Sequence, residues 1–222
     1  SFGDGSTSTL QSPTHTYTSP GTYSVTLTVT DTAGCSNTRT KPIVIAPLPE
    51  ANFGYTAPTC QGDVVSYTDM SSTASGFIAK WIWNFGDGNT QTITFPASPN
   101  VNHAYTNAGT FNVKLIVKTN DSCTNELTRV VTVLPKPMAA FMHGPACLGN
   151  QVTFTDFSIS NTTGTISGWA WNFGDPTSGT ANNSALQNPT HTYNTSGNYT
   201  VSLVVSIPGG CSDTITQQVT VS

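Results

Sequence analysis

HAYTNAGTFNVKLIV, residues 103–117, decides the fold because two other stretches repeat its pattern. HTYTSPGTYSVTLTV occupies residues 15–29 and HTYNTSGNYTVSLVV occupies residues 191–205. Successive copies lie 88 residues apart (103 − 15 and 191 − 103). After the glycine of each copy, apolar and polar residues alternate, which predicts a β-strand with one face in a core. A period of this length is the size of a domain and exceeds the roughly 20 to 50 residues of solenoid repeats.

A second block precedes two of these copies in full and one in part. It reads WIWNFGDG at residues 81–88, WAWNFGD at residues 169–175 and FGDG at residues 2–5. The first copy starts inside the block. We therefore expect the N-terminal strands of the first repeat to lie outside this sequence.

Pro-rich joins separate the copies, at residues 46–49 and 134–137. Short, proline-stiffened joins of this kind mark the borders between modules. The predicted domains are a partial repeat over residues 1–46 and two complete repeats over residues 47–134 and 135–222.

Each complete repeat holds about seven short segments that favour β-structure, with turn residues between them. Residues 64–68 and 151–155 are predicted as early strands, and residues 130–133 and 219–221 as closing strands. No segment shows a helical period over three turns. The sequence therefore predicts an all-β fold made of tandem immunoglobulin-like β-sandwiches.

Composition limits the partners that can be expected. Charged residues make up only 8% of the chain, and the formal net charge is −4. The seven Lys and Arg residues are spread thinly, so no basic stripe is available to neutralise a nucleic-acid backbone. The longest apolar runs are far shorter than the roughly 20 residues that span a bilayer. We expect no nucleic-acid partner and no membrane insertion, with any export signal upstream of this sequence.

The ordered motifs Trp-x-Trp-Asn-Phe-Gly-Asp-Gly, His-x-Tyr and Gly-Thr-Phe/Tyr-x-Val closely resemble the PKD (polycystic kidney disease) repeat. The resemblance covers two complete repeats and the back half of a third. Repeat three departs from it with Pro176 in place of the second glycine and with an excursion over residues 177–184. The resemblance implies extracellular modules strung in long arrays, as in cell-surface and gliding-associated proteins of Bacteroidota.

Three residue types recur where the motifs turn. The glycines around the motif aspartate supply positive φ angles, and its carboxylate can accept backbone N–H bonds across a tight turn. The motif tyrosine is placed like that of a tyrosine corner, whose hydroxyl bonds back to the main chain, and we expect the histidine to brace the same corner. These structural residues are Asp4, Asp87, Asp175, His15, His103, His191, Tyr17, Tyr105 and Tyr193.

The tryptophans admit two interpretations. Trp81 and Trp83 share one face of a predicted strand with Phe85, which favours a place in the core. Trp81 and Trp169 stand at the start of their strands, so we expect each to be the more exposed of its pair. An outward ring can stack on a sugar, which makes these two the candidate ligand-stacking residues.

The repeated His and Asp raise the question of catalysis. No Ser or Cys stands in a nucleophile-elbow or comparable setting, and a constellation present in every domain favours a scaffold role. We therefore expect no enzyme activity. No Cys-x-x-Cys pair points to zinc. Some PKD-like domains carry calcium near their linkers, but the candidate ligands lack an EF-hand-like spacing, so no cofactor is expected. These candidates are Glu50, Asp63, Asp69 and Asp121.

Five cysteines in an exported protein suggest disulfides. Each complete repeat has an early cysteine (Cys60, Cys147) and a late one (Cys123, Cys211), whereas repeat one retains only Cys35. The simplest pairing, favoured by the family-like spacing, is Cys60 with Cys123 and Cys147 with Cys211, which leaves the partner of Cys35 upstream. In ordinary sandwich topology, however, the two turns concerned lie at opposite poles. Cys60 could then meet Cys211 across the domain join.

Two functions of different classes follow. The first is a structural or adhesive array, outside the cell or at its surface, as part of a bacterial adhesin, stalk or filament. Its partners would be neighbouring repeats, surface glycans or other surface proteins. The alternative is a set of accessory binding or spacer modules of a secreted hydrolase that degrades polysaccharide or protein. A third hypothesis is a surface-layer or host-protein-binding component.

Overall fold

The computed structural model describes residues 1–57, 59–161 and 164–222. In this part of the chain nearly all regular structure is β-strand, which confirms the predicted all-β fold. The strands are β1 (Gly21–Thr30), β2 (Ser36–Ile45), β3 (Phe53–Tyr55), β4 (Val64–Asp69), β5 (Ile78–Asn84), β6 (Thr90–Thr94), β7 (Val101–Ala104), β8 (Gly109–Thr119), β9 (Thr124–Val133), β10 (Phe141–His143), β11 (Gln151–Asp156), β12 (Gly168–Asn172), β13 (Asn183–Ser184), β14 (Thr190–Thr192), β15 (Gly197–Ser206) and β16 (Ser212–Val221). The 3₁₀ helix η1 (Pro176–Asn182) falls in the excursion that sets repeat three apart.

The chain divides into two compact units. The first comprises Ser1–Gly54, Tyr67–Val101 and Asn112–Arg129, and the second comprises Tyr55–Ser66, Asn102–Phe111 and Val130–Ser222. The predicted repeat boundaries after residues 46 and 134 stay a prediction.

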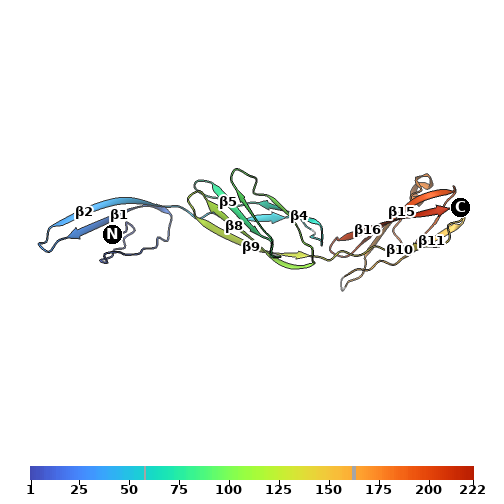
Figure 1. The fold of residues 1–222 in the computed structure, drawn as a ribbon, viewed down its shortest axis with the longest axis horizontal. Helices are drawn as coiled ribbons and strands as arrows, with labels where there is room; N and C mark the ends of the chain where they lie inside the picture. The colour runs from blue at the N-terminus through green and yellow to red at the C-terminus, as the bar shows by residue number, and fades with distance from the viewer. Residues whose placement is uncertain (58, 162–163) are drawn as a thin grey trace. The chain divides into compact units, whose positions relative to one another are not determined.

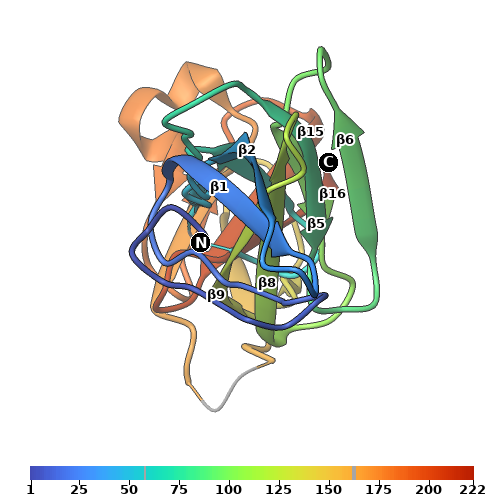
Figure 2. The same cartoon turned by 90° about the vertical axis from the view of Figure 1, so that its left-hand side faces the viewer.

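Long hairpins and a four-stranded sheet dominate the first unit. Strands β1 and β2 pair along their whole length, from Gly21 opposite Ile45 to Thr30 opposite Ser36. A second sheet has the strand order β6-β5-β8-β9, with β6 at its edge (Figure 2). The aromatic strand β5 is therefore central, as its Trp-x-Trp pattern predicts. A central strand is covered on both sides, which suits large aromatic residues.

Two sheets enclose one core in the second unit. Their strand orders are β10-β11-β14 and β13-β12-β15-β16, and Figure 1 shows β15 and β16 side by side. Phe154 of β11, Trp171 of β12 and Leu203 of β15 belong to the same buried cluster. The rings of Phe154 and Trp171 lie 5.6 Å apart, close enough for a favourable tilted contact. Inward-facing residues from both sheets thus form the predicted sandwich core.

The same sequence position has opposite environments in two repeats. Leu203 and Val205 on β15 are 0% exposed, whereas Leu27 and Val29 at the equivalent positions of β1 are 62% and 56% exposed. Alternation predicts a core-facing side for both strands. Among the residues the structure describes, β1 pairs with β2 in a two-stranded sheet, and no second sheet covers its apolar face. The apolar face of β1 is therefore uncovered among the described residues, whereas that of β15 is buried.

Candidate functional site

The turn after β12 places Asp175. Asn172 ends the strand, and its Oδ1 accepts the amide N–H of Gly174 at 2.8 Å. The amide N–H of Asp175 donates to Oδ1 of Asn182, at the end of η1, at 2.7 Å. The backbone of Asp175 and that of the residue before it are therefore both held by asparagine side chains. Sequence reasoning missed Asn182 because it lies in the excursion that the other repeats lack.

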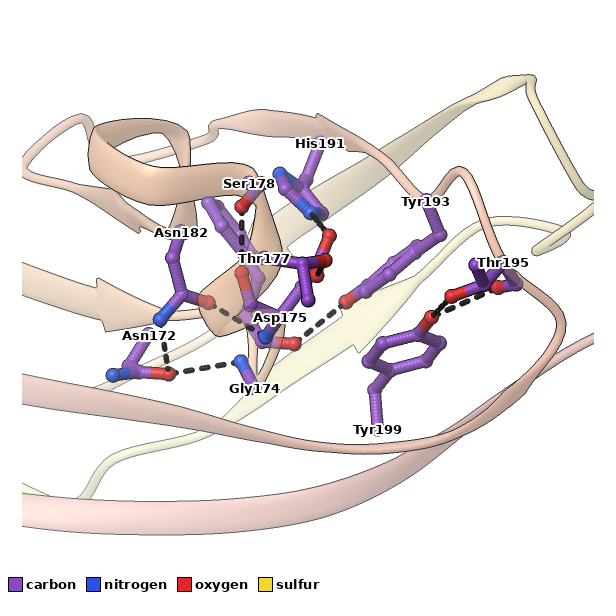
Figure 3. Close-up of polar contacts among 11 residues, drawn as sticks. Asn172, Gly174, Asp175, Thr177, Ser178, Asn182, His191, Tyr193, Thr195 and Tyr199 are labelled. Atoms are coloured by element: carbon purple, nitrogen blue, oxygen red, sulfur yellow. Dashed lines mark hydrogen bonds and ion pairs between the residues drawn. The ribbon is translucent and has the colours of Figure 1, made fainter.

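Asp175, His191 and Tyr193 form a buried cluster (Figure 3), with exposed fractions of 3%, 5% and 0%. Nε2 of His191 lies 3.2 Å from Oδ2 of Asp175. An ionised carboxylate can only accept hydrogen bonds, so Nε2 is the donor. The imidazole stacks on Phe173 with ring centroids 4.5 Å apart, and the Tyr193 hydroxyl donates to the Phe173 carbonyl oxygen at 3.0 Å. The cluster ties the turn after β12 to β14 and the residue that follows it.

Burial and hydrogen bonding act in opposite directions on the pKa of Asp175. Desolvation, the largest single effect, raises this pKa, but hydrogen bonds from Thr177 and His191 together bring it below its ordinary value. Burial raises the pKa of the Tyr193 hydroxyl, and the charge of Asp175 adds to that effect. The corner thus combines an ionised carboxylate with a neutral phenol at neutral pH.

Asp175→Asn should flatten the acid side of the stability profile. A carboxyl whose folded pKa lies below the unfolded value of about 3.9 stabilises the fold above that value and loses this contribution as pH falls through the folded pKa. We expect the melting temperature of the wild-type chain to fall between about pH 5 and pH 3, and that of the variant to fall less. The residual slope belongs to carboxyls such as Asp156, whose pKa is also lowered.

The measurement is thermal unfolding by circular dichroism at a series of pH values. Asp121→Asn, which changes an exposed carboxyl, is the matched control. Equal slopes for the wild type and the Asp175 variant would contradict a stabilising charge at this corner.

Repeat one builds the same corner at the surface. Nε2 of His15 lies 2.7 Å from Oδ2 of Asp4, and the Tyr17 hydroxyl donates to the Phe2 carbonyl oxygen at 2.8 Å. The imidazole stacks on Phe2 with centroids 4.2 Å apart. Hydrogen bonds from Ser6, and then from His15, hold the pKa of the Asp4 carboxyl well below its usual range. The structure therefore brings these three predicted residues together without full burial.

In repeat two, the motif aspartate lies in the first unit, and the motif histidine and tyrosine lie in the second. In the first unit, Oδ1 of Asp87 accepts the amide N–H of Asn89 at 3.0 Å. In the second unit, His103 lies edge-on to Tyr105, with ring centroids 4.6 Å apart. Tyr105 in turn stacks on Phe111 at 4.4 Å. The aspartate accepts a turn amide, and the tyrosine ring packs between His103 and Phe111. The hydroxyl bond of Tyr105 to the main chain stays a prediction.

The polar groups of the corner in repeat three serve to hold its turn in place. Nε2 of His191 faces a carboxylate, and the Thr177 hydroxyl donates to the same carboxylate. The Ser178 hydroxyl donates to the carbonyl oxygen of Asp175 at 2.7 Å. A groove of about 480 Å³ runs beside His191 and is lined mainly by polar side chains and backbone. The contacts hold a turn against a strand through charge-assisted hydrogen bonds.

Trp81 and Trp169 are each the more exposed of their pair, but both indoles are anchored. Nε1 of Trp81 donates to Oδ2 of Asp69 at 2.9 Å, and Nε1 of Trp169 donates to Oδ2 of Asp156 at 2.7 Å. Trp81 is only 6% exposed, so its ring offers too little surface for stacking, which favours the core interpretation over the ligand-stacking one for this residue. Trp169 is half-buried and keeps part of its ring in solvent. A sequence motif cannot reveal the partner aspartates, because they lie on a different strand.

Three of the four candidate calcium ligands have side-chain partners of their own. Asp63 pairs with Lys136, and Asp69 accepts the indole N–H of Trp81. Glu50 joins a backbone bridge, and Asp121 accepts the side-chain amide of Asn120. Within residues 1–57, 59–161 and 164–222, no group of three or more His, Cys, Asp or Glu is placed to hold a metal ion.

Cys60 and Cys211 form a disulfide, with their Cα atoms 5.7 Å apart and a sequence separation of 151 residues. Both are buried, and they pack with Ile207, Leu134 and Ile166 in a small apolar cluster. Leu134 also forms backbone hydrogen bonds with the turn at Cys60. The bond thus ties the early cysteine of the second predicted repeat to the late cysteine of the third.

The favoured intradomain pairing is therefore wrong, and the pairing across the join is correct. The reason is the length of the β15–β16 hairpin. Cys211 lies in its loop, beyond Ser206, whereas the turn at Cys147 bonds to Ser222 at the opposite end. Ten residues of strand at about 3.3 Å each separate the two ends by roughly 33 Å, and a disulfide needs Cα atoms within about 7 Å. Cys35, Cys123 and Cys147 are unpaired thiols in this structure.

Comparison with known families follows the repeat pattern. The family model described as PKD domain matches residues 1–45, 46–134 and 134–221. The chain belongs to the PKD domain family. The Asp, His and Tyr positions of the motif recur in all three PKD matches, and the structure brings them together in repeats one and three.

Two of the curated relatives are a collagenase and a metalloprotease. The chain is 57% identical over 47 residues to a microbial collagenase of Vibrio alginolyticus, covering 21% of this chain and 6% of the relative. It is 39% identical over 90 residues to the pre-pro-metalloprotease PrtV of Vibrio cholerae, covering 39% of this chain and 10% of the relative. The chain therefore spans a tenth or less of the length of the curated relatives that it matches.

Solved structures include similar single PKD domains. The PKD1 domain of Vibrio anguillarum Epp is 27% identical, with a TM-score of 0.35, and covers 40% of this chain and 95% of that domain. The PKD1 domain of Vibrio cholerae PrtV is 25% identical, with a TM-score of 0.34, and covers 39% of this chain and 98% of that domain. In the described part of this chain, no helix is long and apolar enough to cross a membrane.

Proposed function

We propose that this tandem of PKD domains is a covalently braced spacer in an extracellular structural array, of the kind that builds a bacterial surface adhesin, stalk or filament. The observation that carries the proposal is the Cys60–Cys211 disulfide, which joins residues of consecutive repeats. Structural disulfides persist in oxidising, extracytoplasmic surroundings. A bond between modules resists their separation, which is useful to a spacer under tension.

The surface of the chain supports the same role. Weakly charged strands rich in Ser, Thr and Asn give a hydrated surface with little net field, since charged residues make up only 8% of the chain. The side chains of His191 and Tyr193 are hydrogen-bonded within the corner at Asp175 and hold its turn. The proposal therefore assigns no catalytic role and no cofactor to this chain. Its function lies in reach and in contact with surface glycans or other surface proteins.

The test is localisation in the organism that carries the gene. An antibody against residues 1–222 should label intact cells, and the label should disappear after brief protease treatment of the cell surface. The parent reading frame should carry a long run of PKD repeats. Label found only inside permeabilised cells, or two or three repeats attached to a hydrolase domain, would contradict the array.

The protease relatives favour a second candidate, accessory modules of a secreted hydrolase. A microbial collagenase and a pre-pro-metalloprotease both contain segments similar to these PKD domains. In that role the repeats would bind an insoluble protein or polysaccharide. Trp169 is the residue in this chain best placed to contribute, because its half-buried ring is fixed by Asp156.

If the second candidate is right, Trp169→Ala should abolish binding of the chain to insoluble collagen or chitin in a pull-down assay. Stacking on a ligand needs the face of an aromatic ring, and phenylalanine keeps such a face. Trp169→Phe should therefore retain most of the binding. Phe95→Ala, which removes an exposed aromatic ring elsewhere, should leave binding unchanged. No binding by the wild type at high protein concentration would exclude these two ligands for the accessory role.

A further inference from the structure

The turn that carries Cys60 is repeated in full 87 residues later, at Cys147 (147 − 60). At Cys60, the next amide N–H donates to the Leu134 carbonyl oxygen at 2.8 Å, and that of Gly62 donates to Tyr105 at 2.8 Å. At Cys147, the corresponding amides of Leu148 and Gly149 donate to Ser222 at 3.0 Å and to Tyr193 at 2.9 Å. Cys147 thus lies in the same built position as Cys60, beside the end of its own repeat, but it is exposed and unpaired.

The late cysteines also share one geometry. The carbonyl oxygen of Cys211 accepts the amide N–H of Ile207 at 3.0 Å across its hairpin loop. Those of Cys123 and Cys35 accept from Thr119 and Asp31, each at 2.9 Å. Only the late cysteine that faces an early cysteine, Cys211, is bonded.

We propose that the Cys60–Cys211 disulfide is one member of a continuing series, in which the early cysteine of each PKD domain bonds to the late cysteine of the next. Cys147 is then the attachment site for the late cysteine of a PKD domain that follows residue 222. Cys123 and Cys35 are attachment sites for the early cysteines of the domains before their own. The partner is therefore another PKD domain of this kind, and the inference deepens the proposed array by defining how its members are joined.

The bonding step is ordinary thiol–disulfide exchange. One cysteine thiolate attacks a disulfide of the oxidant, either a dithiol–disulfide oxidoreductase or oxidised glutathione, and one thiol of the oxidant leaves. The second cysteine thiolate then attacks the mixed disulfide, forms the new S–S bond and releases the other thiol. Two cysteine thiols are oxidised, and one disulfide of the oxidant is reduced to two thiols.

The join after residue 222 lacks two contacts of the existing one. Lys136 forms an ion pair with Asp63, and 87 residues later the position of Asp63 is taken by Asn150. Leu134 packs against the Cys60–Cys211 disulfide, and 88 residues later its position is taken by Ser222. A disulfide at Cys147 would therefore have less apolar cover. The experiment includes a leucine at this position for that reason.

The test extends the full chain by one repeat. A second copy of residues 135–222 follows Ser222 directly, which preserves the 88-residue register, and the purified protein is reoxidised with oxidised and reduced glutathione. The unextended chain has three alkylatable thiols. The extended protein brings one more early and one more late cysteine and should still show three, because Cys147 and the added late cysteine are bonded. Peptide mass spectrometry should find a Cys147 peptide joined to a Cys211 peptide. Because both copies yield the same peptides, the thiol count of the Cys147→Ser variant distinguishes a bond between copies from a bond within the added copy.

Matched variants separate the outcomes. Cys147→Ser in the extended protein should leave four thiols, and Ser222→Leu should raise the yield of the bond to Cys147. Five thiols in the extended protein, both with Ser222 and with Ser222→Leu, would overturn the proposal. So would a bond within the added copy, a Cys147 disulfide between two molecules, or a glutathione adduct as the final state of Cys147. These outcomes are measured on purified protein. They are therefore independent of the antibody test of the proposed surface array.

Discussion

Pulled from Ser1 and Ser222 in a single-molecule instrument, the oxidised chain is expected to extend roughly 500 Å less than the reduced chain. The reason is the Cys60–Cys211 disulfide, because the residues between its cysteines lie in a closed loop that force on the ends cannot stretch. The sequence separation is 151 residues, and an extended chain spans at most about 3.3–3.6 Å per residue.

Cys60→Ser should give the long extension without reductant. Cys123→Ser is the matched control and should leave the short extension unchanged, because Cys123 is unpaired. If Cys123→Ser instead gave the long extension, the result would support the intradomain pairing of Cys60 with Cys123.

Leu203→Ala is expected to lower the free energy of unfolding of its repeat by about 2–5 kcal/mol, whereas Leu27→Ala should cost less than about 0.5 kcal/mol. Both leucines occupy the same position in the repeat. Leu203 is 0% exposed in the sandwich core, so its removal leaves a cavity, but Leu27 is 62% exposed and has little packing to lose.

Hydrogen exchange with mass spectrometry measures the two effects separately, because peptides from β15–β16 and from β1–β2 report on their own opening. A melting curve reports on all the modules at once and does not assign a cost to one repeat. A large cost for Leu27→Ala would mean that the apolar face of β1 is covered in solution, either by a second copy or by another segment.

Local pattern was sufficient to predict the strands and the corner. Period-two alternation around Val201 and Leu203 requires one buried face, and the structure buries both residues completely. Tyr193 was predictable because a tyrosine just before a long core strand has few uses other than a corner bond, and its hydroxyl donates to Phe173. Both features depend on residues within one repeat and on forces of short range.

Features that depend on geometry between strands or repeats were harder to predict. The spacing of Cys60, Cys123 and Cys211 fits two pairings, and only the hairpin length decides between them. Trp81 looks accessible at a strand start, but Asp69 from β4 fixes its indole and the ring is buried. No local signal marks these partners, because the contacts arise only when separate strands pack together.

The disulfide also changes what a protease can achieve. In an ordinary chain, one backbone cut separates the molecule into two fragments. A single cut between Cys60 and Cys211 would leave Ser1 and Ser222 in one covalently connected molecule, because the sulfur–sulfur bond provides a second path. Any one site inside this closed loop could therefore be cut without detaching whatever the end of the array carries.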